Sequence, residues 1–230
     1  MKILALSDIH GNHGIYRWIP GLSVEHNVET VVLAGDLLGT PEGFERIEDA
    51  QRADAHEIVE LLRPVGVPVL YIMGNDDMIE LGPGLPEFHS LHARRYELGG
   101  FGFVGYQYSL PFMGGIFEKP ESEVAVDIAD LAPLLDDRTV LVTHNPAIGE
   151  LDTGNAGIHA GSESILRAIR SGRVRAHIHG HVHSAFGRSG VHFNVASGGR
   201  RLRGMVIDLE TMIHEVIDEG DIPWDSGDGV

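Results

Sequence analysis

Residues 2–12 have the sequence KILALSDIHGN. Residues 2–7 form a short run rich in apolar side chains, which is typical of a buried strand, and the polar residues Asp8, His10 and Asn12 follow it. In open α/β sheets, ligands bind beyond the carboxyl ends of the strands. We therefore expect a functional site at the point where this first strand ends.

Similar apolar runs recur along the chain and are separated by helical patterns in its earlier part. The runs predict strands at 2–7, 30–34, 67–73, 101–106, 139–143, 174–178, 191–196, 204–209 and 212–217. Apolar residues at helical spacing predict helices at 15–26, 41–63, 121–135 and 162–171. We expect Pro20 to interrupt the first helix, Pro41 to lie in the first turn of the second, and Ser162 to cap the last.

The order of these elements predicts the fold class. Early strands alternate with helices, whereas the end of the chain is nearly all strand, and such a run needs a facing sheet to bury its apolar side. We therefore expect a layered α/β domain with two packed sheets. With 230 residues the chain is long enough for one domain, which we place at 1–218, followed by an acidic C-terminal tail at 219–230.

Composition narrows the classes of function. The chain has 34 acidic and 17 basic residues, a formal net charge of −17, and only two lysines, so long nucleic acid is an unfavourable partner. It contains no cysteine, which leaves histidine and carboxylate as its strong metal-binding side chains. The apolar stretch at residues 2–7 is too short for a membrane span or a secretory signal, so we expect a cytoplasmic protein without membrane contact.

Polar residues with metal-binding atoms follow five of the predicted strands. They are Asp8, His10 and Asn12 after the first, Asp36 after the second, Asn75, Asp76 and Asp77 after the third, His144 after the fifth, and His181 and His183 after the sixth. Two divalent cations held about 3.5–4 Å apart need an anionic bridge, which we assign to Asp36. Imidazoles and an amide complete such a site without repelling phosphate. A water that bridges the cations has a lowered pKa and can attack phosphorus.

These motifs, Asp-x-His, Gly-Asp, Gly-Asn-x-Asp, an isolated His and Gly-His-x-His, resemble in this order those of the calcineurin-like metallophosphoesterase superfamily. The resemblance covers roughly residues 1–209 and is greatest to the prokaryotic Icc-related phosphoesterases. It implies a four-layer α/β/β/α sandwich of two mixed sheets flanked by helices. It also implies two divalent ions per chain, drawn from Mn, Fe, Zn, Ni and Co with Mn favoured. One ion is expected on Asp8, His10, Asp36 and His183, and the other on Asp36, Asn75, His144 and His181.

Asp76 departs from the family pattern, because many members have histidine there as a phosphate contact and proton donor to the leaving group. An aspartate near two cations stays ionised and is a poorer acid, so we expect a preference for esters with good leaving groups. We assign Asp77 to the orientation of an imidazole and count Asp36, Asp76 and His144 as catalytic. Candidate substrate contacts are Asn12, Asp76, His159 and Arg200.

Alternatives remain open for single residues and for the function. Asp8, Asp36 and Asn75 each have a residue type common in turns, His159 fits an ordinary loop histidine, and Arg200 fits a solvated turn. The favoured function is hydrolysis of a small phosphodiester or nucleotide by a metal-bridging hydroxide. The alternatives are a phosphomonoesterase, a nuclease acting as a homo-oligomer, and a non-enzymatic metal-binding interaction scaffold. We expect the loop 106–120 to carry substrate specificity.

Overall fold

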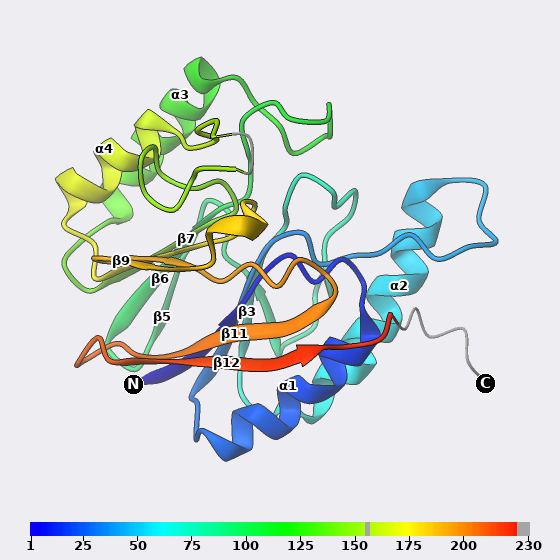
Figure 1. Cartoon of the computed structure of the whole chain (residues 1–230). Coiled ribbons are helices and arrows are strands. Elements are labelled where there is room, and N and C mark those ends of the chain that lie inside the picture. The colour runs from blue at the N-terminus through cyan, green and yellow to red at the C-terminus, as the bar shows by residue number, and fades with distance from the viewer. Residues whose placement is uncertain (155–156, 225–230) are drawn as a thin grey trace.

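The computed structural model describes residues 1–154 and 157–224, which build two packed β-sheets (Figure 1). The first sheet has the strand order β12-β11-β1-β2-β3-β4, in which β1 to β4 are parallel and β11 and β12 antiparallel to their neighbours. The strands are β1 Lys2–Leu6, β2 Thr30–Ala34, β3 Val69–Ile72, β4 Phe88–Ser90, β11 Arg201–Asp208 and β12 His214–Asp221.

The second sheet has the order β5-β6-β7-β8-β10-β9. Its four central strands are parallel, and the edge strands β5 and β9 are antiparallel to their neighbours. The strands are β5 Arg95–Leu98, β6 Phe101–Tyr106, β7 Thr139–Thr143, β8 Ala176–His179, β9 Gly187–Ser189 and β10 His192–Asn194. Both sheets are therefore mixed.

Helices cover the outer face of each sheet (Figure 1). They are α1 His13–Glu25 and α2 Ile47–Leu62 on the first sheet, and α3 Glu121–Leu131 and α4 Glu163–Gly172 on the second, with short 3₁₀ helices at Arg63–Val65, Ala132–Leu134 and His183–Ala185. Side chains alternate along each strand, so Leu4 and Leu6 pack on the helices while Ile3 and Ala5 pack between the sheets. The expected four-layer α/β/β/α sandwich is confirmed. No described helix is both long enough and apolar enough to cross a membrane.

Several expected boundaries are wrong. Helix α2 begins at Ile47 rather than at 41, because residues 41–46 form a loop beside a cavity, and α1 runs through Pro20 without interruption. The short strands β4, β5 and β9 were not predicted, since three or four partly polar residues at a sheet edge carry no apolar period. Strand β12 includes residues 219–221 of the expected tail, and residues 225–230 of it lie outside the described residues. The Ser162 cap is confirmed by the bond from the Ile165 N–H to its Oγ.

Candidate metal centre

The predicted ligands lie at one edge of the sandwich, where parallel strands of both sheets end. Asp8 follows β1, Asp36 follows β2 and Asn75 follows β3, while His144 follows β7 and His181 and His183 follow β8. The loops turn sharply at the ligands: Asp8, His10, Asp36 and His181 have φ angles of 56°, 50°, 51° and 68°. This left-handed region is costly for most residues with a side chain, and four of the nine non-glycine residues that adopt it in the described chain are these candidate ligands.

The glycines of the motifs let these loops come close together. A Cβ on Gly180 would lie 2.2 Å from Asp8 Oδ2, and a Cβ on Gly74 would lie 2.2 Å from Asp36 Oδ1. Both contacts are far shorter than van der Waals distance, so only glycine allows the loop after β8 to reach Asp8 and the loop after β3 to reach Asp36. Steric clashes with Asp8 and Asp36 therefore explain why glycine precedes His181 and Asn75 in these motifs.

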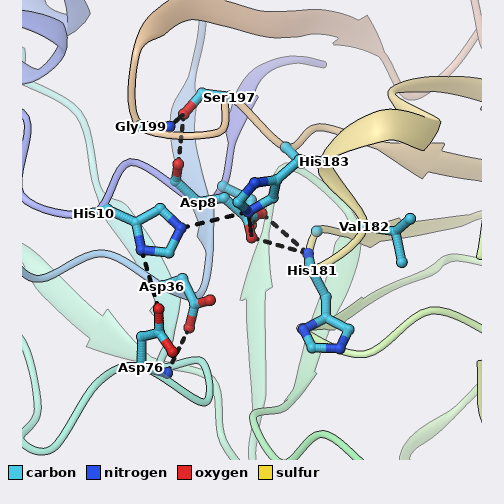
Figure 2. A network of polar contacts seen from close by, with 12 residues as sticks. Asp8, His10, Asp36, Asp76, His181, Val182, His183, Ser197 and Gly199 are labelled. Atoms are coloured by element: carbon cyan, nitrogen blue, oxygen red, sulfur yellow. Dashed lines mark hydrogen bonds and ion pairs between the residues drawn. The ribbon is translucent and has the colours of Figure 1, made fainter. Parts of the chain in front are cut away.

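The first group of converging side chains consists of Asp8, His10 and His183 (Figure 2). His183 Nε2 lies 3.0 Å from Asp8 Oδ1 and 3.4 Å from His10 Nε2. Burial opposes ionisation of Asp8, but the His183 hydrogen bond and the charges of His144 and His183 hold its pKa well below the usual value. Asp8 therefore presents a carboxylate beside two imidazoles.

A second group is formed by Asp36, Asn75 and His144. His144 Nε2 lies 3.2 Å from Asp36 Oδ2 and 3.1 Å from Asn75 Oδ1, and His144 Nδ1 donates to the Ala34 carbonyl at 2.9 Å. That last bond directs Nε2 toward the carboxylate. Although burial raises the pKa of Asp36, the charge and hydrogen bond of His144 lower it overall. Asp8, Asp36 and His144 also converge, with one ligand atom from each within 4.8 Å of the others.

His181 joins the two groups less directly. Its backbone N–H donates to both carboxylate oxygens of Asp8 at 3.1 Å (Figure 2). Its ring packs edge-on against the His144 ring, with centroids 5.2 Å apart. Burial, followed by the charge of His144, lowers the pKa of His181 to about 4, so the ring is neutral as metal ligation requires. Carboxylate and imidazole donors in this arrangement fit divalent first-row ions.

Asp76 and Asp77 have different environments. Asp76 Oδ2 lies 3.4 Å from His10 Nδ1, and its backbone N–H donates to Asp36 (Figure 2). In the metal-free protein burial and the Asp36 charge raise the pKa of Asp76, whereas bound cations would lower it. Asp77 is buried and accepts the backbone N–H groups of Leu37, Leu38 and Gly74. It orients the loop after Asp36 rather than an imidazole, which corrects our expectation.

The expected substrate contacts Asn12, Arg200 and His159 also lie in different environments. Asn12 is buried, caps α1 by accepting the Gly14 N–H, and donates to the Gly199 carbonyl, so its amide is occupied within the protein. Arg200 lines a separate cavity with Asp221, Ile222, Pro223 and Trp224 and none of the metal-site residues. The roles of Asn12 and Arg200 as substrate contacts stay predictions. His159 does line a cavity that contains metal-site residues.

Two cavities open at the centre. One, here called the α2 cavity, has a volume of about 720 Å³ and is lined by the loop after β2, the start of α2 and Trp224. The other, here called the β8 cavity, has about 680 Å³ and is lined by residues 110–113, by described residues of 154–160 and by 181–184. His10, Asn75, Asp76 and Met113 line both.

The sequence reasoning missed two contributors to this site. Ser197 Oγ donates to the Asp8 carbonyl at 2.8 Å and so supports the left-handed turn. Glu118 accepts the backbone N–H groups of Phe112, Met113 and Gly114, which orders the tip of the 106–120 loop above the site. The glycines of the 106–120 loop could have indicated a close approach to the site, because Gly115 lies against the Asn75 carbonyl oxygen.

A model of the calcineurin-like phosphoesterase family matches residues 1–185 of the chain. The solved structure of TT1561 of Thermus thermophilus is similar, with 16% identity, a TM-score of 0.67, and coverage of 94% of this chain and 98% of that chain. A dimetal phosphatase from Danio rerio has 13% identity and a TM-score of 0.60, with 96% of each chain covered. A novel archaeal phosphodiesterase has 17% identity, a TM-score of 0.53, and coverage of 95% and 99%. No curated protein matches the chain significantly.

Proposed function

Because the chain belongs to the calcineurin-like phosphoesterase family, we propose that it hydrolyses a small phosphodiester with the help of two divalent ions. The observation that carries this proposal is the convergence of Asp8, His10 and His183 beside Asp36 and His144, all within reach of shared ions. Two bound cations would activate a water toward phosphorus and neutralise the phosphoryl oxygens.

We assign the candidate ligands to two ion positions. Asp8, His10 and His183 would hold one ion, and Asn75, His144 and His181 the other, with Asp36 between them. The buried Ala34 carbonyl fixes the His144 ring, and Ser197 and the His181 N–H fix Asp8, so these ligands are oriented before an ion arrives. The mixture of carboxylates and imidazoles fits Mn, Fe, Zn, Ni or Co, and we use Mn²⁺ as the first ion to test.

Protonation of the leaving group needs a further residue, since Asp76 beside two cations is a poor acid. His159 lines the β8 cavity, and its Nδ1 bonds the buried Asp152 at 2.8 Å, which leaves Nε2 available. Burial opposes the charge of Asp152, yet the bond from His159 keeps the pKa of this carboxyl below its usual value. His159 is therefore our candidate proton donor.

Charge and size favour a small substrate. The net charge is −17, and no lysine or arginine lines either cavity within 1–154 and 157–224, so binding of a polyanion is unfavourable. Two structural neighbours are described as a phosphodiesterase and as a dimetal phosphatase, so both ester classes belong in the test.

The experiment compares bis-p-nitrophenyl phosphate, cyclic AMP, an alkyl monophosphate and single-stranded DNA with Mn²⁺ and with chelator. We expect Mn²⁺-dependent turnover that is fastest on the aryl diester. Fastest turnover of the monophosphate or of DNA would identify the phosphomonoesterase or nuclease alternative. Ion binding without turnover of any ester would favour the interaction scaffold.

A further inference from the structure

The two cavities meet at the residues proposed to hold the ions. Of the proposed ligands, His10 and Asn75 line both the α2 cavity and the β8 cavity, as does the neighbouring Asp76, whereas Asp36, His181 and His183 line the β8 cavity alone. A phosphorus atom bound at the ions therefore lies where the cavities join, and groups attached to it can extend into each. Cavities of about 700 Å³ are each large enough for an aromatic ring or a nucleoside.

Apolar side chains line much of both spaces. The α2 cavity has Leu38, Pro41, Ile47, Met78, Met113 and Trp224, and the β8 cavity has Leu110, Pro111, Phe112, Met113, Ile158 and Val182. Several of these side chains are exposed, including Ile47 at 52%, Ile158 at 69% and Phe112 at 70%. Exposed apolar side chains gathered around a polar centre are typical of ligand sites.

Met113 lies between the cavities on a well-anchored loop tip. Glu118 accepts its N–H at 2.8 Å and those of Phe112 and Gly114 at 2.8 and 2.9 Å. The tip also rests on the metal-site loop, because a Cβ on Gly115 would lie 2.4 Å from the Asn75 carbonyl oxygen. These contacts therefore hold the backbone of Met113 where the two cavities meet.

The residues that line the cavities also limit the charge that a substrate substituent can carry. Among the described residues, neither cavity is lined by a lysine or arginine, and the α2 cavity contains the carboxyl groups of Glu42 and Asp54. The ions would neutralise the phosphate being cleaved, but a second anionic group would find no lysine or arginine among the described residues of either cavity, and in the α2 cavity it would face the Glu42 carboxyl group.

We infer that the substrate is an acyclic diester of one phosphate, with two separate, uncharged and largely apolar substituents, one in each cavity. This inference rests on the proposed function. A monoester has one substituent and a cyclic diester joins both ester oxygens to one group, so each leaves a cavity unfilled. A substituent that carries another phosphate would find no lysine or arginine to pair with its charge among the described residues of the cavity.

The test uses p-nitrophenyl esters, so that the leaving group is constant. The set is bis-p-nitrophenyl phosphate, ethyl p-nitrophenyl phosphate, the p-nitrophenyl ester of thymidine 5′-phosphate, and the same nucleotide ester with a 3′-phosphate. Each kcat/KM with Mn²⁺ is divided by the hydroxide rate of that ester. We expect the diaryl and thymidine esters to exceed the ethyl ester by at least about tenfold, and the 3′-phosphate to lower the rate by about tenfold.

Matched variants test each cavity separately. Ile47→Ser and Ile158→Ser each remove an exposed apolar side chain, and Ile213→Ser, where Ile213 is 71% exposed between β11 and β12 and lines neither cavity, is the control. We expect both cavity variants to lower the diaryl rate by about fivefold while the ethyl rate changes less, and the control to resemble the wild type.

Two failures can be told apart. No Mn²⁺-dependent turnover of any ester would overturn the proposed function. Turnover of all esters with no preference for the diaryl ester, with tolerance of the 3′-phosphate, or with loss in only one cavity variant would overturn this inference and leave the phosphoesterase function standing.

Discussion

The Nε2 atom of His10 lies 3.4 Å from the Nε2 atom of His183, although 173 residues separate them in the chain. Asp8 Oδ1 lies 3.0 Å from the same His183 nitrogen. Loops after β1 and β8, which belong to different sheets, thus direct three donor atoms to one point. This relationship makes metal content the most direct test of the site.

We expect reconstituted wild-type protein to bind two Mn²⁺ per chain, and His10→Ala and His183→Ala each to bind about one. Because both imidazoles serve the same ion, the double variant should lose no further ion than either single variant. Metal analysis after dialysis measures this, with His56→Ala on an exposed part of α2 as control. Fewer than one ion per wild-type chain would refute the metal centre.

Asp36→Asn and His144→Ala should each leave less than about a tenth of wild-type turnover, because each removes a ligand. Asp36→Asn preserves shape and should keep the fold. His144 is fully buried and its Nδ1 bonds Ala34, so His144→Ala should also lower the Tm by several degrees. Circular dichroism and steady-state rates measure both effects. A variant with more than a tenth of the activity would contradict the assignment of its residue.

Replacing Asp76 by histidine should raise the rate on alkyl monophosphates, because an imidazole near the ions protonates a poor leaving group better than a carboxylate. Rates on an alkyl monophosphate and on bis-p-nitrophenyl phosphate are compared at equal metal content. An unchanged ratio between the two substrates would count against the leaving-group argument and not against the metal site.

The proposed role of His159 predicts an effect that depends on the leaving group. His159→Gln should lower the rate on alkyl esters by about 100-fold but the rate on p-nitrophenyl esters by much less, since p-nitrophenolate leaves without a proton. Asp152→Asn should shift the same ratio in the same direction by weakening control of the ring. Equal losses on both ester types would indicate a binding role for His159.

Buried histidines away from the ligands should make the protein sensitive to acid. His177 and His192 lie in adjacent strands with their Nδ1 atoms 3.0 Å apart, and His177 Nε2 lies 2.8 Å from Thr143 Oγ1. Burial lowers the pKa of both rings, so the unfolded chain binds more protons below about pH 6.5 and stability falls as pH decreases.

Burial lowers the pKa of His177 further than that of His192, so His177 should account for more of the stability lost as the pH falls below about 6.5. His177→Gln should therefore lower the Tm near pH 7.5 but reduce the further loss on going to about pH 5. Thermal unfolding in the presence of chelator measures this without contributions from bound ions. A pH dependence equal to that of the wild type would show that His177 does not contribute.

The sequence by itself determined the layered α/β class and the order of the metal-binding motifs. Both depend on local chemistry. Apolar runs identify central strands because those strands are buried on both faces, and a ligand directly after such a strand must lie at its carboxyl end. Gly74 and Gly180 are part of these local motifs. A side chain at either position would clash with a ligand aspartate, so the motif requires glycine there.

Only the tertiary structure decided which distant segments meet. Asp77 binds backbone N–H groups of the loop after Asp36, Asn12 is occupied within the protein, and Arg200 faces a separate cavity. The pairing of His159 with Asp152 and the division of the cavities by Met113 also depend on loops that pack together in space. A local pattern records burial and turn preference, whereas a side chain's partner is set by the packing of whole layers, which no single stretch of sequence contains.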